Sequence, residues 1–386
     1  GDEFEATDTC RDGLEAYEKI KNNSYDAVLL DINMPRMNGL ELLQKLQKEN
    51  IRATVVVVSS LAKEDAKITI QAMEYGAIDF ITKPENIIEA KGLQFRRELS
   101  SLLNSILPQS RQAKAPAVQP VLVRPMTGKP VPAGAAVKPS GAAATKPTSA
   151  AARASLSAAA ARASVAAANT GAASASAGNS TRTVPRKAPA GGGGQKLIAL
   201  ACSTGGPKSL QSVIPYLDKN MDAPMVLVQH MPTGFTKSMA ERLNELSKVQ
   251  VKEAQENDVL KKGCVYVAPG GYHLEVVAAK DGTHKIHLSD APAIGGLRPC
   301  ANVMYKSLRR CAYDEIVCVV LTGMGADGTD GIKDLNRAKP IYVIAQDEPT
   351  CVVYGMPKAI AEAGLVDEVV PLTNIPKRII NQVGVK

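Results

Sequence analysis

Three side chains in the second half of the chain have types and positions that suit nucleophilic catalysis. Ser203 follows the apolar run Leu197–Ala201, His230 follows the apolar residues of Met225–Gln229, and Asp327 lies in a glycine-rich turn beyond a further apolar run. Ligands of open α/β sheets collect outside the carboxyl ends of the strands, so three such positions converge in one cleft. A serine hydroxyl becomes a nucleophile when imidazole takes its proton and a carboxylate orients the imidazole. The placement predicts a serine hydrolase.

Each of these residues also fits a simpler interpretation when it is taken alone. Ser203 before Gly205 and Gly206 is as typical of a phosphate-binding turn as of a nucleophile. A single histidine such as His230 is more often a hydrogen-bonded core residue. Asp327 before a glycine is also typical of a turn. The local pattern is not the Gly-x-Ser-x-Gly of the α/β hydrolases. The spacing of these residues alone therefore favours a hydrolase only modestly over a nucleotide-binding fold.

Such a site needs a histidine base and backbone donors for an oxyanion, and the sequence offers few candidates for either. Only three further histidines occur: His273 is expected in a turn, and His284 and His287 are expected as solvated residues of a hairpin strand. An oxyanion needs backbone N–H donors. Two glycine-rich turns offer them, residues 203–206 and 323–325.

The elements that position these residues alternate between strands and helices over residues 195–386. This alternation predicts a doubly wound, mostly parallel α/β sheet. Asp281–Gly282 predicts the turn of a hairpin between Glu275 and His287. Helices are expected at Ser238–Ser247 and Asn302–Ala312. The expected strands are Leu197–Ala201, Met225–Gln229, Val265–Ala268, Ile316–Leu321 and Ile341–Ala345.

Residues 1–107 form a second α/β region. Ala27–Leu30 and Thr54–Val58 are continuous apolar runs, as expected for strands buried on both faces of a parallel sheet. Helical spacing is found at Leu40–Leu46 and at Ala66–Tyr75. This region is therefore predicted to be a separate α/β domain.

Residues 108–194 differ from both halves in composition. They consist mainly of Ala, Pro, Ser, Gly, Thr, Val, Lys and Arg, which predicts a disordered linker, with a partly helical stretch at Ala151–Ala168 as an alternative. The formal charge of the chain is +8, and this segment holds eleven basic and no acidic residues, so the remainder carries about −3. The segment has no aromatic residue for base stacking, and no recognition-helix pattern occurs, which argues against nucleic-acid binding.

The seven cysteines are odd in number and lack C-x-x-C spacing. This argues against a zinc cage or a disulfide framework and predicts a cytoplasmic location. No apolar stretch is long enough to span a membrane, and no signal-peptide pattern is present. The sequence starts Gly-Asp-Glu rather than with Met, which suggests that residues precede it.

Five motifs in residues 195–386 resemble the chemotaxis protein-glutamate methylesterases, the CheB family. The resemblance implies that Ser203, His230 and Asp327 form a catalytic triad and that the backbone amide of Met324 helps to hold the oxyanion. It also implies hydrolysis of glutamate methyl esters on chemoreceptors to glutamate and methanol, and deamidation of receptor glutamines. The motifs are ACSTGG (201–206), QHMPTGF (229–235), VAPG (267–270), LTGMGADG (321–328) and IAQDEPTCVVYGMP (344–357).

The first region resembles the phosphoacceptor receiver domain that precedes the esterase in this family, with a flavodoxin-like fold. VLLDINMPRMNG (28–39) resembles the phosphorylation motif and implies that Asp31 accepts the phosphoryl group. Ser59 matches the switch hydroxyl, and Lys83 matches the lysine that pairs with the phosphoryl group. A carboxylate flanked by Mg²⁺, a hydroxyl and an ammonium is what acyl phosphate formation needs.

The sequence also departs from the family pattern. It begins at what resembles the second strand of a receiver, so the first strand, its Mg²⁺-binding acidic pair and the first helix are expected to be absent. Only Asp31 and the carbonyl of Asn33 then remain as Mg²⁺ ligands, and weak phosphorylation and weak folding of this domain are expected. In the esterase, Ala201 and Cys202 replace Gly and Ala. Cys300 and Asn302 replace Ser and Asp, and these changes are expected to alter the rate or the substrate preference.

Together these observations predict a phosphorylation-regulated methylesterase of chemotaxis, cytoplasmic at receptor clusters, with no cofactor for the ester hydrolysis. Chemoreceptors would be its substrates and a histidine kinase its phosphodonor. The unphosphorylated receiver would cover the esterase cleft, leakily because a long linker lowers the effective concentration. The alternative is a response regulator whose second half is a catalytically inactive binding module for receptors or nucleotides.

Overall fold

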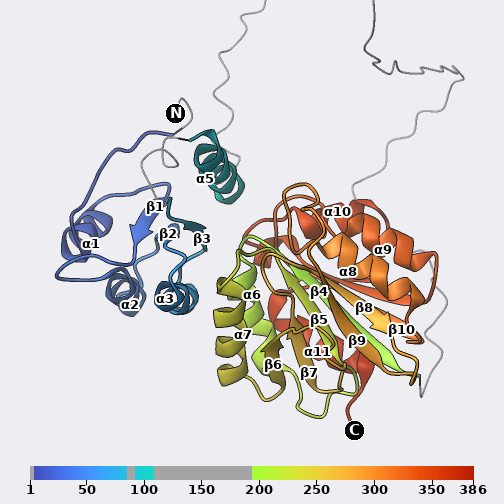
Figure 1. The fold of residues 1–386 in the computed structure, drawn as a ribbon. Coiled ribbons are helices and arrows are strands. Elements are labelled where there is room, and N and C mark those ends of the chain that lie inside the picture. Colours follow the sequence, from blue (N-terminus) through green and yellow to red (C-terminus); the bar gives the residue numbers. More distant parts are fainter. Residues whose placement is uncertain (1–3, 85–91, 108–193) are drawn as a thin grey trace, which may run out of the picture. The chain divides into compact units, whose positions relative to one another are not determined.

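The computed structural model describes residues 4–84, 92–107 and 194–386 (Figure 1). The predicted linker, with its stretch Ala151–Ala168, lies outside these residues except for its last position. None of the described helices combines the length and apolar character needed to cross a bilayer. The seven cysteines are all free.

The first α/β region contains a three-stranded parallel sheet in the order β1-β2-β3. Residues 4–10 form no strand, so the expected receiver strand at the start of the chain is not present; a strand without a hydrogen-bonding neighbour is not stable. The elements are α1 (Gly13–Asn22), β1 (Val28–Asp31), α2 (Gly39–Lys48), β2 (Val55–Ser59), α3 (Lys63–Glu74), β3 (Asp79–Thr82) and α5 (Leu93–Ile106).

The phosphorylation motif lies where β1 ends and α2 begins. Asn38 caps α2 through a capping box, in which its side chain accepts the Glu41 N–H and the Glu41 carboxylate accepts the Asn38 N–H. Asp31 is the last residue of β1, and β1 pairs in parallel with β2. The strand therefore places Asp31 at the carboxyl edge of the sheet. The prediction that this strand is buried on both faces was wrong, because Leu29 is 47% exposed.

The second region contains a seven-stranded parallel sheet in the order β12-β11-β10-β4-β5-β7-β6. The predicted doubly wound architecture is confirmed. The five predicted strands appear with bounds shifted by at most one residue. The strands are β4 (Lys196–Cys202), β5 (Met225–Gln229), β6 (Gln250–Glu253), β7 (Cys264–Val267), β10 (Glu315–Val320), β11 (Ile341–Gln346) and β12 (Glu368–Val370).

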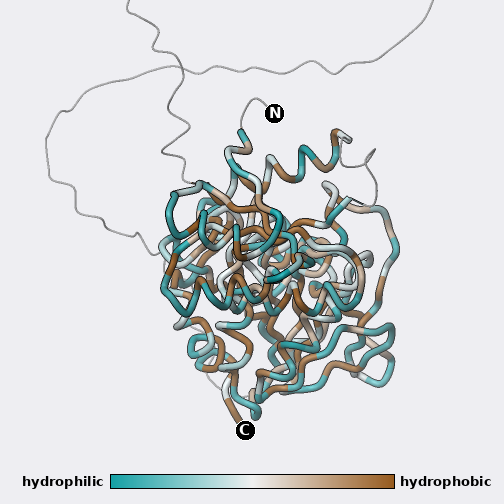
Figure 2. The backbone as a smooth tube through the Cα atoms, turned by 90° about the vertical axis from the view of Figure 1, so that its left-hand side faces the viewer, coloured by the Kyte–Doolittle hydropathy of each residue, from teal (hydrophilic) through white to brown (hydrophobic). Residues whose placement is uncertain are grey.

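Helices cover both faces of this sheet (Figure 1). The helices α6, α7 and α11 contribute Leu210, Met239 and Ile379 to one hydrophobic core, and α8, α9 and α10 contribute to the core on the opposite face. In Figure 2 hydrophobic and hydrophilic stretches alternate along the tube, as expected for elements that bury one side. The α-helices are α6 (Gly206–Val213), α7 (Phe235–Leu246), α8 (Ala301–Ser307), α9 (Thr329–Asn336), α10 (Met356–Glu362) and α11 (Ile375–Val383).

Shorter elements complete the domain. The strands β8 (His273–Ala278) and β9 (His284–Ser289) form the predicted antiparallel hairpin. The predicted helix at Asn302–Ala312 is shorter than expected, because α8 ends at Ser307 and a 3-10 turn, η3 (Leu308–Arg310), follows. The other 3-10 turns are η2 (Ile214–Tyr216), η4 (Glu348–Thr350) and η5 (Leu372–Asn374).

Candidate active site

His230 and Asp327 form a buried pair at the carboxyl edge of the seven-stranded sheet. His230 directly follows β5, and Asp327 lies in the loop between β10 and α9. The imidazole Nε2 is 2.8 Å from Asp327 Oδ2, and the side chains are only 8% and 7% exposed. A carboxylate in this position orients the imidazole and stabilises the imidazolium that forms when the base takes a proton.

The Asp327 carboxylate is held by four donors. Oδ2 accepts the Ala301 N–H at 2.6 Å besides His230, and Oδ1 accepts the Asn302 N–H at 3.0 Å and the Cys300 thiol at 3.1 Å. Burial by itself raises the pKa of Asp327. The hydrogen bond and charge of His230 and the two amides outweigh this effect and lower the pKa to about 2. The carboxylate is therefore ionised throughout the physiological pH range.

Ser203 is placed next to His230 by strand register. It follows β4 directly, and the last residues of the neighbouring strands, Cys202 and Gln229, are register partners. The His230 N–H donates to the Cys202 carbonyl at 3.2 Å, and the Ser203 N–H donates to the Thr322 carbonyl at 3.0 Å. The backbone of Ser203 is thus fixed between the residues that precede His230 and the loop that carries Asp327.

No direct hydrogen bond joins the Ser203 hydroxyl to the imidazole within the part of the chain that the structure describes. Because Nε2 of His230 is taken by Asp327, Nδ1 is the nitrogen left to accept the serine proton. Hydrogen bonds between nucleophile and base are commonly long in the absence of substrate and shorten in the substrate complex. The structure thus brings the three predicted residues to one edge of the sheet, with the His230–Asp327 contact already formed.

The Met324 backbone amide lies in the loop that packs against Ser203. Among the described residues it donates to no acceptor. The preceding residue, Gly323, approaches Ser203 so closely that an added Cβ would lie 2.8 Å from Ser203 Cβ and 3.0 Å from Ser203 N. The Gly323 carbonyl in turn accepts the N–H groups of Gly355 and Met356. An oxyanion donor requires a free backbone amide, and Met324 offers one directly after the residue that contacts Ser203.

Gln229 is a residue of the site that sequence reasoning missed. Its buried amide donates from Nε2 to the Ser203 carbonyl and to the His230 carbonyl, both at 3.0 Å. Its Oε1 accepts the Cys202 thiol at 3.0 Å. One side chain therefore links the backbones of Ser203 and His230. The available signal was a glutamine at the end of an otherwise apolar strand.

The other histidines have structural surroundings. His273 begins β8 rather than lying in a turn, and its Nε2 is 3.2 Å from the Pro292 carbonyl. His284 was wrongly predicted to be solvated: it is buried, accepts the Ala312 N–H at 2.9 Å and stacks on Tyr313. Burial, and next the charge of Lys339, lower the pKa of His284, so it is neutral. His287 is half-exposed, as predicted.

The first region brings Asp31 and Lys83 together. Lys83 Nζ is 2.6 Å from Asp31 Oδ2, across the carboxyl ends of β1 and β3. The Ser59 hydroxyl is buried and contacts other groups, since it accepts from Thr69 at 2.6 Å and donates to the Ser60 carbonyl. The structure therefore joins the predicted phosphoacceptor to the predicted lysine, and leaves the predicted switch hydroxyl bonded elsewhere.

The surroundings of Asp31 do not make a complete Mg²⁺ site within the described residues. Asp31 Oδ1 accepts the backbone N–H of Asn33 at 3.2 Å, while the side-chain amide of Asn33 donates to the Asp65 carboxylate. No group of three or more Asp, Glu, His or Cys side chains in the described part of the chain is placed to hold a metal ion. The described residues therefore offer Mg²⁺ little more than one carboxylate, which is fewer ligands than the ion ordinarily needs from a protein.

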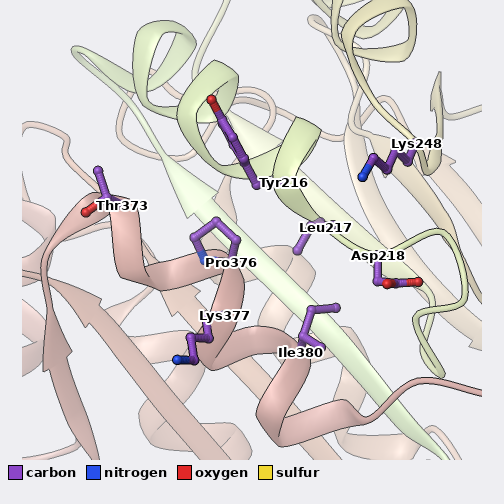
Figure 3. Close-up of a pocket in the computed structure, with 8 residues that line it drawn as sticks. All are labelled: Tyr216, Leu217, Asp218, Lys248, Thr373, Pro376, Lys377 and Ile380. Carbon is purple, nitrogen blue, oxygen red and sulfur yellow. The ribbon is translucent and has the colours of Figure 1, made fainter.

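A cavity of about 340 Å³ lies elsewhere on the second α/β region (Figure 3). It is formed by the segment after α6, the end of α7 and the start of α11, with Tyr216, Lys248 and Lys377 among its lining residues. Of the described residues that line it, none is a serine, cysteine or histidine. Its chemistry does not provide a nucleophile with a base, which leaves the Ser203–His230–Asp327 group as the candidate site.

Comparison with known proteins agrees with this organisation. Residues 198–379 match the CheB methylesterase family, and residues 2–91 match the response regulator receiver domain. A protein-glutamate methylesterase/protein-glutamine glutaminase of Pyrococcus abyssi is 36% identical over 381 residues, which cover 99% of this chain and 87% of that protein. The protein with the same name from Bacillus subtilis is 34% identical over 377 residues, 98% of this chain and 90% of its own.

A solved structure is also similar. The crystal structure of the Thermotoga maritima CheB methylesterase catalytic domain has 42% sequence identity, covers 49% of this chain and 99% of that chain, and gives a TM-score of 0.47. The full-length relatives at about this chain's own length decide the assignment. The chain belongs to the family of receiver-linked protein-glutamate methylesterases/protein-glutamine glutaminases, the CheB family.

Proposed function

We propose that the chain is a phosphorylation-regulated methylesterase of bacterial chemotaxis, which hydrolyses glutamate methyl esters on chemoreceptors with Ser203, His230 and Asp327. The observation that carries the proposal is the buried His230–Asp327 pair at 2.8 Å, next to Ser203 at the end of the neighbouring strand. The names of the relatives support the same substrate class. The protein would act in the cytoplasm, at receptor clusters on the inner face of the membrane.

The chemistry follows from the placement of these groups. Ser203 Oγ attacks the ester carbonyl carbon while His230 Nδ1 takes the hydroxyl proton. The Met324 N–H stabilises the negative charge on the carbonyl oxygen. The tetrahedral intermediate collapses, and methanol leaves with the proton from His230. Water then attacks the acyl-enzyme by the same route, which yields a glutamate carboxylate and free Ser203.

Deamidation of receptor glutamines would use the same steps. The carboxamide carbon takes the place of the ester carbon, and ammonia leaves instead of methanol. An amide is a poorer acyl donor than a methyl ester because its nitrogen is a poorer leaving group. The proton that His230 donates to the leaving nitrogen is therefore more important for the amide than for the ester.

Measurement of methanol release from a methylated receptor tests the triad. Ser203→Ala is expected to remove ester hydrolysis, because it removes the hydroxyl that would attack the ester carbonyl carbon. Methanol release from the Ser203→Ala protein at the rate of the parent would support the second candidate, an inactive binding module that holds receptors or nucleotides. The proposal needs no cofactor for the ester hydrolysis.

We further propose that Asp31 is the regulatory phosphoacceptor, with a chemotaxis histidine kinase as donor and Lys83 as the cation that pairs with the phosphoryl group. The 2.6 Å contact between Lys83 and Asp31 supports these roles. Ser59 would serve as the switch hydroxyl after its hydrogen bonds to Thr69 and Ser60 are exchanged. Where a full receiver supplies further carboxylates, Asp31 and the Asn33 carbonyl would be among the ligands of Mg²⁺. The unphosphorylated receiver would cover the esterase cleft.

A further inference from the structure

The N-terminus of α8 faces the carboxylate of Asp327. The residue at the N-cap position, Cys300, has extended backbone angles, and its side chain accepts no hydrogen bond from the helix. The amides of Ala301 and Asn302, which an N-cap side chain ordinarily helps to satisfy, donate to Asp327 instead. Asp327 thus caps a helix that is distant from it in the sequence.

A second cap runs in the opposite direction. The Asn302 side chain accepts through Oδ1 the N–H groups of Gly328 at 3.1 Å and Gly331 at 2.6 Å, at the start of α9. Gly331 permits this approach, since an added Cβ would lie 2.9 Å from Asn302 Cα. Asp327 directly precedes Gly328. The two helix starts therefore cap each other, and the carboxylate lies at their junction.

The thiol of Cys300 completes this arrangement. Its Sγ is 3.1 Å from Asp327 Oδ1, the oxygen that does not contact His230, and the residue is only 1% exposed. Burial, and next the negative charge of Asp327, raise the pKa of Cys300 to about 11. The sulfur thus carries its proton at neutral pH and acts as a donor.

The donors are divided between the two carboxylate oxygens. Oδ1 receives Cys300 and the Asn302 amide, while Oδ2 receives the Ala301 amide and His230. A rotation of the carboxylate that moves Oδ2 away from His230 would break the bonds at Oδ1 as well. The four donors therefore fix the angle at which Oδ2 meets the imidazole.

We infer that Cys300 is a positioning residue of the esterase, whose thiol holds the Asp327 carboxylate toward His230. This inference rests on the proposed triad. Loss of the donor leaves Oδ1 with one bond fewer and allows the carboxylate to rotate.

Kinetics of methanol release by the full chain test the inference, with three variants. Cys300→Ala is expected to lower kcat about tenfold, the effect of one lost hydrogen bond to a charged group, with KM changed less than about twofold. Cys300→Ser keeps a donor and is expected to stay within about threefold of the parent. Cys264→Ala removes another buried sulfur from the same domain and is expected to match the parent.

A proton NMR measurement reports on the His230–Asp327 contact directly. The imidazole N–H that donates to a carboxylate gives a resonance far downfield, and Cys300→Ala is expected to shift or broaden it while Cys300→Ser preserves it. Parent-like kcat and resonance in Cys300→Ala would overturn the inference. Equal losses in Cys300→Ser or in Cys264→Ala would overturn it too, because the donor would then not be the cause. The Ser203→Ala variant distinguishes a failure of the inference on Cys300 from a failure of the proposed triad. If Ser203→Ala stays active, the proposed triad itself is wrong.

Discussion

The ionisation of Asp327 dominates the energetics of the site at the residue scale. His230 and the amides of Ala301 and Asn302 hold its pKa at about 2 against the effect of burial, and the side chain is almost fully buried. An amide at this position cannot hold the histidine in the same tautomer or stabilise the imidazolium. Asp327→Asn is therefore expected to lower kcat about 10³- to 10⁴-fold, measured as methanol release. Asp330→Asn, a change of an exposed carboxylate three residues away, is the matched control and is expected to match the parent.

The ionised Asp327 carboxylate is also expected to make the stability of the fold depend on pH in the acid range. Its folded pKa lies below the unfolded value of about 3.9, so its contribution is fully present above that pH and is lost as the pH falls through about 2. The contribution is about 2 kcal/mol. Between pH 4 and pH 2, the melting temperature of the parent is expected to fall more steeply than that of Asp327→Asn. Parallel slopes, followed by circular dichroism, would show that the carboxylate is not stabilised by the fold.

The contacts of Cys300 and Gln229 could not be predicted from the sequence. Ser203, His230 and Asp327 could be proposed because each follows an apolar run, a property of local sequence. The thiol of Cys300 contacts Asp327 across 26 intervening positions of the chain, and Gln229 donates to the carbonyls of two residues that directly follow two different strands. No local pattern encodes such contacts. His284 was mispredicted for the same reason, since Ala312 and Tyr313 cover it only in the folded chain.

The more deeply buried a strand of the seven-stranded sheet is, the more readily it could be predicted from the sequence. The central strands β4, β5 and β10 are continuous apolar runs, so their existence followed from the sequence. The edge strands β6 and β12 were missed, because Gln250–Glu253 is mostly polar and Glu368–Val370 has only three residues. These omissions did not affect the prediction of the site, because β4 and β5, which directly precede Ser203 and His230, are neighbours near the middle of the sheet.

Gln229 joins two elements, β4 and β5, and its removal is expected to affect both. Gln229→Leu keeps the volume but leaves the carbonyls of Ser203 and His230 without their shared donor. A loss of about 1–3 kcal/mol in the free energy of unfolding is expected, together with a lower kcat. Gln250→Leu, at an exposed position of β6, is the control for the substitution itself. An unchanged kcat in a less stable Gln229→Leu protein would reduce Gln229 to a purely structural role.

The loop between β10 and α9 approaches Ser203 through Gly323. An alanine there would place its Cβ 2.8 Å from Ser203 Cβ, closer than van der Waals contact allows. Gly323→Ala is expected to shift Ser203 or the Met324 amide and to lower kcat at least about 100-fold, comparable to the loss of an oxyanion donor. Far-ultraviolet circular dichroism should show a folded protein. If Gly323→Ala retained full methanol release, the loop would not be the close wall of the site.

The whole molecule combines a basic central segment with two domains that together carry a formal charge of about −3. The eleven basic residues between 108 and 194 account for the formal charge of +8, so the charge gives no support for a nucleic-acid target. The chain instead combines two matched domains, a receiver and a methylesterase, so the proposed regulation would be a property of the full chain. The order of the domains could be predicted from motifs, whereas the conformation of the segment between them lies outside the described residues.

Regulation is testable only on the whole chain. Asp31 lies 2.6 Å from Lys83, so a phosphoryl group on Asp31 would replace one carboxylate–ammonium pair by a stronger one. A small-molecule phosphodonor with Mg²⁺ is expected to raise methanol release about fivefold, the lower end of ordinary coupling, because a long connection weakens intramolecular inhibition. Asp31→Asn is expected to keep the basal rate and lose the response. An equal response in Asp31→Asn would place the phosphoacceptor elsewhere, and no response in the parent would separate esterase activity from the receiver.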